Sequence, residues 1–240
     1  MMINNTRLLA KREIADSTME FTLLKPEGFD YQAGQTIDLS LINPVESDQR
    51  GNMRTFSLVS APHESELKIA MRIRNSSFKQ VLKSMEENVE LFLEGPFGSF
   101  GLHKKVERPA VFLAGGIGIT PFYSMINDAT YRKLENKIIL FFSNHNPSDA
   151  PFLAELQALE KENPNFTLVA TMTSLESYEP AWEGEKGRID ANLIKKYLPK
   201  ETLPFYYLSG PQTMVEAMRN LLEKMEVDSD DIRFEEFSGY

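Results

Sequence analysis

Three glycines between an apolar strand and a helix start are the strongest chemical signal in the chain. The segment Ala110–Pro121 reads AVFLAGGIGITP, so a buried strand runs directly into Gly115, Gly116 and Gly118. Glycines at such a turn let a ligand approach the backbone, and the N-terminus of the following helix favours an anion. The pattern predicts a nucleotide phosphate site, although it is not the GxGxxG dinucleotide fingerprint. A turn that needs glycine only for packing is the alternative, and the threonine and proline that follow favour the site.

A short run in the first half of the chain combines a cation, an aromatic ring and a hydroxyl. Alternate residues of a strand share a face, so Arg54 and Phe56 would point the same way. Arg54 could clamp a phosphate, Phe56 could stack on a flat ligand, and Ser57 adds a hydroxyl. Taken alone, the run is better explained as a strand with a core phenylalanine and a surface arginine.

Three further segments have the composition of turns or anchors and are weak signals individually. Leu93–Phe100, LEGPFGSF, is a glycine–proline turn after a strand. Tyr207–Met214, YLSGPQTM, places a similar turn after a late strand, and strand ends in open α/β sheets line ligand crevices. The tail Ile232–Tyr240, IRFEEFSGY, carries aromatic residues, which at a chain end usually anchor to a core.

Composition excludes several classes of protein. The 240 residues are 42% hydrophobic and 25% charged, which is ordinary for a soluble globular protein. Cysteine is absent, which excludes disulfides, a thiolate zinc site, a cysteine nucleophile and an iron–sulfur cluster held by these residues. The net charge of −9 disfavours a nucleic-acid partner.

The sequence carries no signal for secretion, for a membrane span or for a metal site. The N-terminus does not resemble a signal peptide, and the most apolar stretch is too short for a membrane span. We therefore expect a cytoplasmic protein with no membrane span. His63, His103 and His145 are too scattered to suggest a metal site, so we assign no metal ligand.

The pattern of apolar and polar residues changes near residue 102, which predicts two domains. Residues 1–102 carry short alternating segments typical of an antiparallel barrel, interrupted by a helix over Ser77–Glu87. Residues 103–240 alternate strands and helices, which favours a parallel sheet in an α/β domain. The polar segment Gly101–Arg108 serves as the linker. We expect strands at 7–14, 18–24, 35–41, 54–60, 67–73, 89–93, 110–114, 137–143, 167–173 and 205–209, and helices at 121–130, 151–162, 191–197 and 212–225.

Taken together and in this order, these segments resemble the ferredoxin–NADP reductase-like flavoprotein superfamily over essentially the whole chain. In that family an antiparallel β-barrel that binds FAD precedes an α/β domain that binds a pyridine nucleotide. The family motif Arg-x-Tyr-Ser is matched by Arg54, Phe56 and Ser57, with phenylalanine in place of tyrosine, and Thr55 is the intervening residue. The resemblance implies that Arg54 holds the flavin pyrophosphate, Phe56 stacks on the isoalloxazine, and Ser57 hydrogen-bonds near flavin N5.

The resemblance implies further flavin contacts elsewhere in the barrel. One strand would pass beside the flavin, a helix start would meet the pyrophosphate, and a glycine turn would close the barrel. The residues implied are Met71 and Ile73 on the strand, Ser76 and Ser77 at the helix start, and Gly95 and Gly98 at the turn.

In the second half the resemblance implies a nicotinamide site. The glycine turn matches the family's nicotinamide-nucleotide turn, with Gly115, Gly116, Gly118, Thr120 and Pro121 as the matching residues.

The last two segments complete the implied active site. The family's Cys-Gly-Pro turn beside the nicotinamide is matched by Ser209, Gly210 and Pro211, with serine for cysteine, and Met214 follows. The Glu-x-aromatic pattern near the C-terminus is matched by Glu235 and Phe237, with Tyr240 as a competing candidate for covering the flavin. Ser57, Ser209 and Glu235 are the catalytic residues that the resemblance implies.

The implied activity is an NAD(P)H-dependent flavoprotein oxidoreductase. Hydride would pass from the nicotinamide to FAD, and electrons would then leave to a separate acceptor, either a ferredoxin-type redox protein or a small molecule. The alternative is a flavin-binding interaction or regulatory protein without efficient hydride transfer, which the serine at 209 permits. We expect NADH to be favoured, because Leu175 and Glu176 stand where NADP-using relatives carry a basic residue, although Lys186 and Arg188 could fold back.

Overall fold

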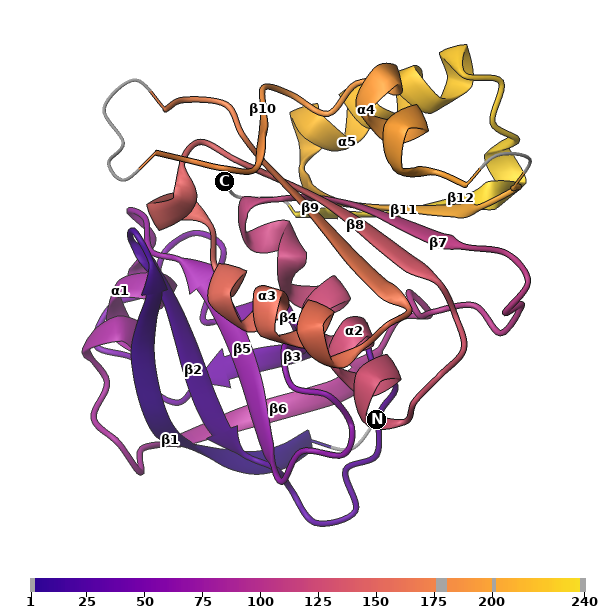
Figure 1. The fold of residues 1–240 in the computed structure, drawn as a ribbon. Helices are drawn as coiled ribbons and strands as arrows, with labels where there is room; N and C mark the ends of the chain where they lie inside the picture. Colours follow the sequence, from indigo (N-terminus) through magenta and orange to yellow (C-terminus); the bar gives the residue numbers. More distant parts are fainter. Residues whose placement is uncertain (1–2, 176–180, 200–201, 238–240) are drawn as a thin grey trace.

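The structure is a computed structural model that describes residues 3–175, 181–199 and 202–237 of the chain. Figure 1 shows an antiparallel sheet that curls into a barrel and, beside it, a parallel sheet flanked by helices. The expected order of a barrel followed by an α/β part is therefore confirmed. The domain boundary between residues 102 and 103 stays a prediction.

Within the described ranges six antiparallel strands form the barrel: β1 (Ile3–Ala15), β2 (Thr18–Leu24), β3 (Thr36–Leu41), β4 (Met53–Ser57), β5 (Glu66–Arg72) and β6 (Glu90–Phe97). Their order is β4-β3-β6-β1-β2-β5. The segment just after β4 meets the other outer strand, β5, where the backbone N–H of Val59 donates to the carbonyl of Lys68 at 2.8 Å. Every second residue of β3 is buried, so Ile37, Leu39 and Leu41 fill the barrel core.

Two features of the barrel differ from the sequence expectations. The helix expected over Ser77–Glu87 is α1 (Ser77–Ser84), because the backbone of Met85 already has ψ 138°. Gly95 was expected in a closing turn and instead lies inside β6, where a bulge interrupts the pairing with β3. Gly98 follows the end of that strand.

The second part is a parallel sheet with strands β7 (Ala110–Gly115), β8 (Ile138–Asn144), β9 (Phe166–Met172), β10 (Glu185–Lys186), β11 (Phe205–Pro211) and β12 (Ile232–Phe237), and helices α2 (Ile119–Tyr131), α3 (Leu153–Glu162), α4 (Ala191–Tyr197) and α5 (Gln212–Lys224). The strand order is β10-β9-β8-β7-β11-β12. β7 is buried along its whole length, as expected for a parallel strand covered on both faces. The short β10 and the edge strand β12 were not expected from the sequence.

An apolar core joins the barrel to the parallel sheet. Helices α2 and α3 lie between the two parts, and α4 and α5 cover the far face of the sheet (Figure 1). The core between the parts combines Val59 and Ala70 from the barrel side with Phe112, Phe122 and Tyr207 from the second part. Since all five side chains are at most 6% exposed, burial of apolar surface holds the two parts together.

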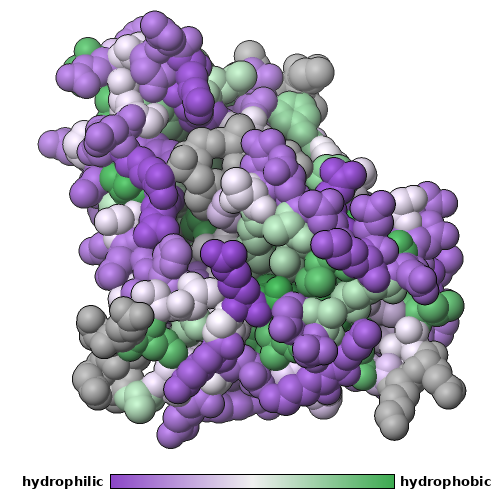
Figure 2. Space-filling model, turned by 90° about the horizontal axis from the view of Figure 1, so that it is seen from above, coloured by the Kyte–Doolittle hydropathy of each residue, from purple (hydrophilic) through white to green (hydrophobic). Residues whose placement is uncertain are grey.

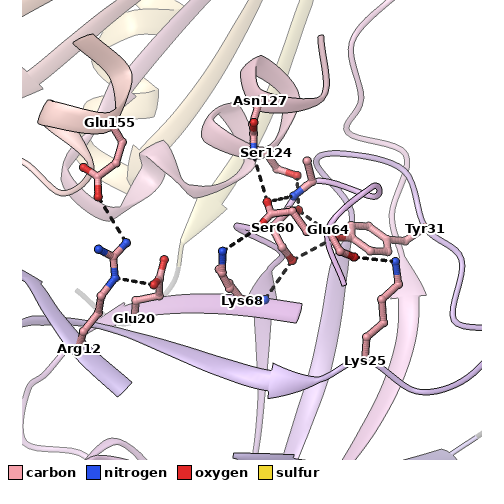
Figure 3. Close-up of polar contacts among 11 residues, drawn as sticks. Arg12, Glu20, Lys25, Tyr31, Ser60, Glu64, Lys68, Ser124, Asn127 and Glu155 are labelled. Atoms are coloured by element: carbon pink, nitrogen blue, oxygen red, sulfur yellow. Dashed lines mark hydrogen bonds and ion pairs between the residues drawn. The ribbon is translucent and has the colours of Figure 1, made fainter. Parts of the chain in front are cut away.

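Buried hydrogen bonds fix the position of α2 on the barrel (Figure 3). The hydroxyl of Ser124 donates to the carbonyl of Ser60 at 2.7 Å, and the Tyr31 hydroxyl donates to the same carbonyl at 3.0 Å. The side-chain amide of Asn127 donates to the carboxylate of Glu64 at 3.0 Å. These directional contacts set the register of the helix against the barrel.

Ion pairs fasten α3 and the loop before it to the other side of the barrel. Arg12 pairs with Glu155 at 3.3 Å and with Glu20 at 2.7 Å, as Figure 3 shows. Arg72 pairs with Asp149 at 3.0 Å, with side chains 30% and 15% exposed. Asp149 thereby joins the second part to the barrel.

The expected linker is integrated into the second part. His103 is 7% exposed, and its backbone N–H donates to the Tyr207 hydroxyl at 3.0 Å. The guanidinium of Arg233 donates to the same hydroxyl and to the carbonyl of Gly101, both at 3.2 Å. The linker is thereby tied to β11 and β12.

The outer face over α4 and α5 is mainly hydrophilic, with apolar side chains gathered near its middle (Figure 2). On this side Phe234 is 45% exposed, and the Arg219 guanidinium lies 4.5 Å from the centre of its ring. In the part of the chain that the structure describes, no helix has the length and apolar character needed to cross a membrane.

Candidate functional site

A hydrogen bond between the two parts marks the candidate site. The hydroxyl of Ser57, at the end of β4, donates to the carboxylate of Glu235 on β12 at 3.3 Å, across 178 positions of the chain. Glu235 is the register partner of Ser209 on the neighbouring strand β11. The structure therefore brings together the three residues that the sequence assigned to catalysis.

Burial gives Glu235 unusual acid–base properties. Loss of solvent raises the pKa of its carboxyl group to about 7, and the hydrogen bond from Ser57 opposes that rise only in part. A group with this pKa can hold or release a proton near neutral pH. Perturbed carboxyl groups of this kind are common at functional sites.

The hydroxyl of Ser209 is buried, and it has no hydrogen-bond partner within the described ranges. Ser209 itself is only 1% exposed. An unpaired buried hydroxyl costs free energy, so such a group is usually explained by a ligand, a water molecule or a functional role.

The glycine turn packs directly against the end of β11. A Cβ atom at Gly118 would lie 2.4 Å from the carbonyl oxygen of Ser209 and 2.6 Å from the Cα of Gly210. A Cβ atom at Gly115 would lie 2.3 Å from the sulfur of Met214. Packing against backbone therefore demands glycine at Gly118, whereas at Gly115 the contact is with a flexible side chain that can shift. The alternative considered from the sequence thus accounts for part of the motif.

Gly116 has a different environment from its two neighbours. Its φ is +53°, and nothing lies within 4 Å of where its Cβ would be. It opens a short 3-10 turn (Gly116–Gly118) that leads into α2, and no side chain caps the start of either helix. Pro121, expected to open this helix, is its third residue, while Thr120 is 2% exposed and donates to the carbonyl of Ile117 at 3.1 Å. This end of α2 can receive an anion.

Pro211 joins this group at the end of β11. It is the last residue of the strand and the N-cap of α5, and its ring would lie 3.4 Å from a Cβ at Gly115. The two predicted nicotinamide turns therefore form one surface at the carboxyl edge of the sheet.

The predicted pyrophosphate residues lie together around a carboxylate. Both Arg54 Nη2 contacts are with the carboxylate of Asp48, at 2.7 and 3.0 Å. The hydroxyl of Ser76 lies 3.4 Å from the same carboxylate instead of capping its own helix. Asp48 is therefore an anion held by the residues that the sequence assigned to a phosphate.

Cationic side chains gather around this position. Burial lowers the pKa of Lys79, and the nearby charges of Arg74, Arg54 and Arg50 lower it further. A cluster of positive charges at one place favours an anion with more than one negative charge. A diphosphate has the required chemistry, so the residues present fit FAD at this end of the site.

Phe56 and Arg54 share a face of β4, as expected. The Arg54 guanidinium lies 5.3 Å from the centre of the Phe78 ring, and the Phe56 ring lies 5.9 Å from the same ring. Phe56 is 8% exposed and belongs to the barrel core. Thr55 faces the other way and hydrogen-bonds to Asp38, so the structure does not bring its side chain to the others.

Two of the other predicted flavin residues lie in or against the barrel core. Met71 is 3% exposed and packs in the barrel core, and Ile73 is partly buried against the same core. Ser77 is the first residue of α1, beside Ser76. Phe237 pairs with Pro211 through the backbone of β12, and Tyr240 lies outside the described residues.

Sequence reasoning missed two residues, one at the carboxyl edge of the parallel sheet and one in a loop of the barrel. Asn144 ends β8, is 7% exposed, and both polar atoms of its side chain are without partners in the described structure. A polar residue directly after an apolar strand was the available signal. Asp48 was missed because an acidic residue in a loop is ordinarily solvated.

The second part of the chain matches a known domain family, and the whole chain matches a known fold. Residues 112–220 match the family model described as the oxidoreductase NAD-binding domain. A ferredoxin NADP+ reductase from Neisseria gonorrhoeae, solved with bound FAD and NADP, has a TM-score of 0.79 at 20% identity and covers 98% of each chain. The fold is that of the ferredoxin–NADP reductase-like flavoproteins. The resemblance inferred from the sequence is confirmed at this level.

Two relatives of this reductase fold cover most of the chain. A component of the Na(+)-translocating NADH-quinone reductase of Pseudoalteromonas atlantica is 27% identical over 203 residues, covering 78% of this chain and 49% of its own length. Reductase component 2 of a Comamonas terephthalate 1,2-dioxygenase is 26% identical over 211 residues, covering 87% and 60%. The chain thus spans about half to three fifths of the length of these relatives.

The packing of the glycine turn predicts a stability difference. Gly118→Ala should lower the free energy of unfolding by about 2–3 kcal/mol, because its methyl group meets backbone atoms that cannot move independently. Gly116→Ala should cost only about 1 kcal/mol, for the left-handed backbone. Urea unfolding followed by circular dichroism measures both. Equal losses for the two variants would contradict the packing argument.

The raised pKa of Glu235 predicts a pH-dependent gain from Glu235→Gln in flavin-free protein. Below pH 4.5 the carboxyl is protonated in both folded and unfolded states, so the gain should vanish there. As pH rises to about 7 the unfolded state loses its proton first, which destabilises the wild type. The variant should therefore be more stable by about 2 kcal/mol at pH 8.

Denaturant titrations at pH 4 and pH 8 measure this difference. Glu216→Gln, on the exposed side of α5, is the matched control and should change stability little at either pH. A stability change for Glu235→Gln that is the same at both pH values would refute the assignment.

Proposed function

We propose that the chain is an NAD(P)H-dependent flavoprotein reductase that passes electrons through FAD to a separate acceptor. The observation that carries this proposal is the hydrogen bond between Ser57 and Glu235 beside Ser209. It joins a residue of the predicted flavin site to a residue of the predicted nicotinamide site. Hydride transfer requires such proximity of the two ligands.

The two ends of the site would bind different ligands. Arg54 and Ser76 would hold the diphosphate of FAD, and the turn around Gly116 with the start of α2 would hold the nicotinamide nucleotide. The unpaired hydroxyl of Ser209 offers a donor and an acceptor to a ligand at the strand end. When bound, FAD supplies hydride acceptance from the nicotinamide and stepwise release of electrons to the acceptor.

Ser57 and Glu235 are the residues that would hold and move a proton at the site. The Ser57 hydroxyl donates a hydrogen bond to Glu235 and can accept one when that carboxyl is protonated, and the carboxyl of Glu235 is poised to hold a proton near neutral pH. The core between the two parts excludes water from this junction, since Ser57 is 3% exposed. The protein thus positions the reactants and moves a proton beside them.

The acceptor is proposed from the relatives. One relative is named as part of a quinone reductase and another as the reductase component of a dioxygenase, and both names describe proteins that deliver electrons elsewhere. A separate redox protein of the ferredoxin type is the lead acceptor, and a diffusible small molecule is the alternative. The cytoplasmic location expected from the sequence stays a prediction.

Anaerobic titration with NADH and NADPH, followed by flavin absorbance, tests the proposal. Wild type should be bleached. Gly116→Ala should keep its FAD but need at least about tenfold more NADH, because the new methyl group fills the space that the nucleotide uses. Gly28→Ala is the matched control, since Gly28 also has a left-handed φ of +73° with nothing within 4 Å.

Each other outcome has a defined meaning. Flavin that no nicotinamide reduces would support a binding or regulatory module instead of a reductase. Protein that cannot bind FAD would overturn both possibilities. Unchanged NADH dependence in Gly116→Ala would remove this turn from the nucleotide site.

Coenzyme preference is the finer prediction. Leu175 is partly buried against the core and cannot serve a 2′-phosphate, and Glu176 lies outside the described residues. β10 places Lys186 beside Met172 at the end of β9, where it offers a cation, and Arg188 follows two residues later. We expect NADH to be preferred by about tenfold in kcat/KM, or ~1.4 kcal/mol. A wild-type preference for NADPH would contradict the expected preference for NADH. Loss of that NADPH preference in Lys186→Ala would assign the 2′-phosphate to Lys186.

A further inference from the structure

Asp48 occupies the centre of the predicted diphosphate site. It lies in the loop between β3 and β4, and its carboxylate accepts two hydrogen bonds from Arg54 and one from the backbone N–H of Arg50 at 2.9 Å. The hydroxyl of Ser76 is the fourth donor, at 3.4 Å. A carboxylate and a phosphate accept hydrogen bonds from the same kind of donors, and arginine binds both through its two parallel N–H groups.

The chain itself engages the guanidinium of Arg54 on two sides. Nη2 is committed to Asp48, and Nη1 donates to the backbone carbonyls of Arg50, Gly51 and Met53 at 2.7–3.0 Å. The Arg54 side chain is 17% exposed and that of Asp48 is 28% exposed. A diphosphate can reach the Nη2 side of this arginine only by displacing the carboxylate.

We propose that Asp48 is an internal competitor for the diphosphate of FAD, which occupies Arg54 and Ser76 in the free protein and is displaced when the cofactor binds. This inference rests on the proposed function, because it takes FAD as the ligand of the barrel. It adds a residue that sets cofactor affinity by competing for the binding residues.

The loop that carries Asp48 is held at its base, where the N–H of Leu41 donates to the carbonyl of Asn52 at 2.9 Å. Around Asp48 itself the backbone contact in the described structure is one turn, in which the N–H of Gly51 donates to the carbonyl of Asp48 at 2.9 Å. Hydrogen bonds from Arg54 hold the pKa of Asp48 below its ordinary value, so the carboxylate carries its charge at neutral pH. Only the fraction of molecules with a released Arg54 binds FAD at full strength, which lowers the apparent affinity by that fraction.

Binding of FAD to flavin-free full-length protein, measured by quenching of flavin fluorescence, tests the inference. Asp48→Asn and Asp48→Ala should each bind FAD about five- to tenfold more tightly than wild type. ADP, measured by calorimetry, should gain similarly because it carries the same diphosphate. Riboflavin lacks phosphate and should show no gain.

Two controls isolate the competition. Glu90→Gln removes one negative charge from an exposed ion pair with Arg7 on the same barrel and should leave FAD affinity unchanged. In an Arg54→Ala background the Asp48 substitution should lose its effect, since its competition acts through that arginine.

Several results would overturn the inference. Unchanged or weaker FAD binding in folded Asp48→Asn and Asp48→Ala proteins would refute it while leaving the proposed function intact. An equal gain for riboflavin, or a gain that persists without Arg54, would show that the effect is not competition for the diphosphate. Failure of wild type and both variants to bind FAD would remove the proposed function and this inference together.

Discussion

The apolar core between the barrel and the parallel sheet is the contact on which the candidate site depends. This core packs residues of β7 and β11 against the barrel. Ser57 from the barrel thereby contacts Glu235 from the parallel sheet. Neither part alone contains both groups. The hydrogen bonds of Ser124 and Asn127 then fix how α2 sits on the barrel, and α2 begins at the glycine turn. Hydrophobic burial supplies the strength of the contact, and the polar contacts supply its geometry.

The polar groups of the site differ from those of the rest of the molecule. Interface groups such as Ser124 and Tyr31 have partners, whereas the hydroxyl of Ser209 and the amide of Asn144 have none in the described structure. Glu235 is partly buried with a hydrogen bond from a neutral donor, and Arg54 is satisfied by a carboxylate from the loop before its strand. These groups therefore add little to the stability of the free protein. Groups of this kind are typical of sites where ligands bind.

Much of the fold could be predicted from local patterns, because periodicity and turn residues act over short distances. β2 and α4 have the bounds expected from the sequence, and the alternation of strands and helices after residue 108 correctly indicated a parallel sheet. β12 was missed because its pairing with β11 is non-local and its residues resemble an aromatic tail. The glycine motif does lie at a strand–helix turn, but only the structure separates Gly118, where packing against backbone requires glycine, from Gly116, where nothing lies within 4 Å. Asp48 could not be found from its type alone, since its role depends on where its loop folds.

The central claim is that flavin bound on the barrel meets the ends of β11 and β12, and a crystal structure of the protein with FAD tests it most directly. The account predicts the diphosphate within hydrogen-bond distance of Arg54 and Ser76, Asp48 moved away from that guanidinium, and the isoalloxazine beside Ser57 at the junction of the two parts. A flavin bound elsewhere, or a diphosphate that leaves Asp48 on Arg54, would contradict it.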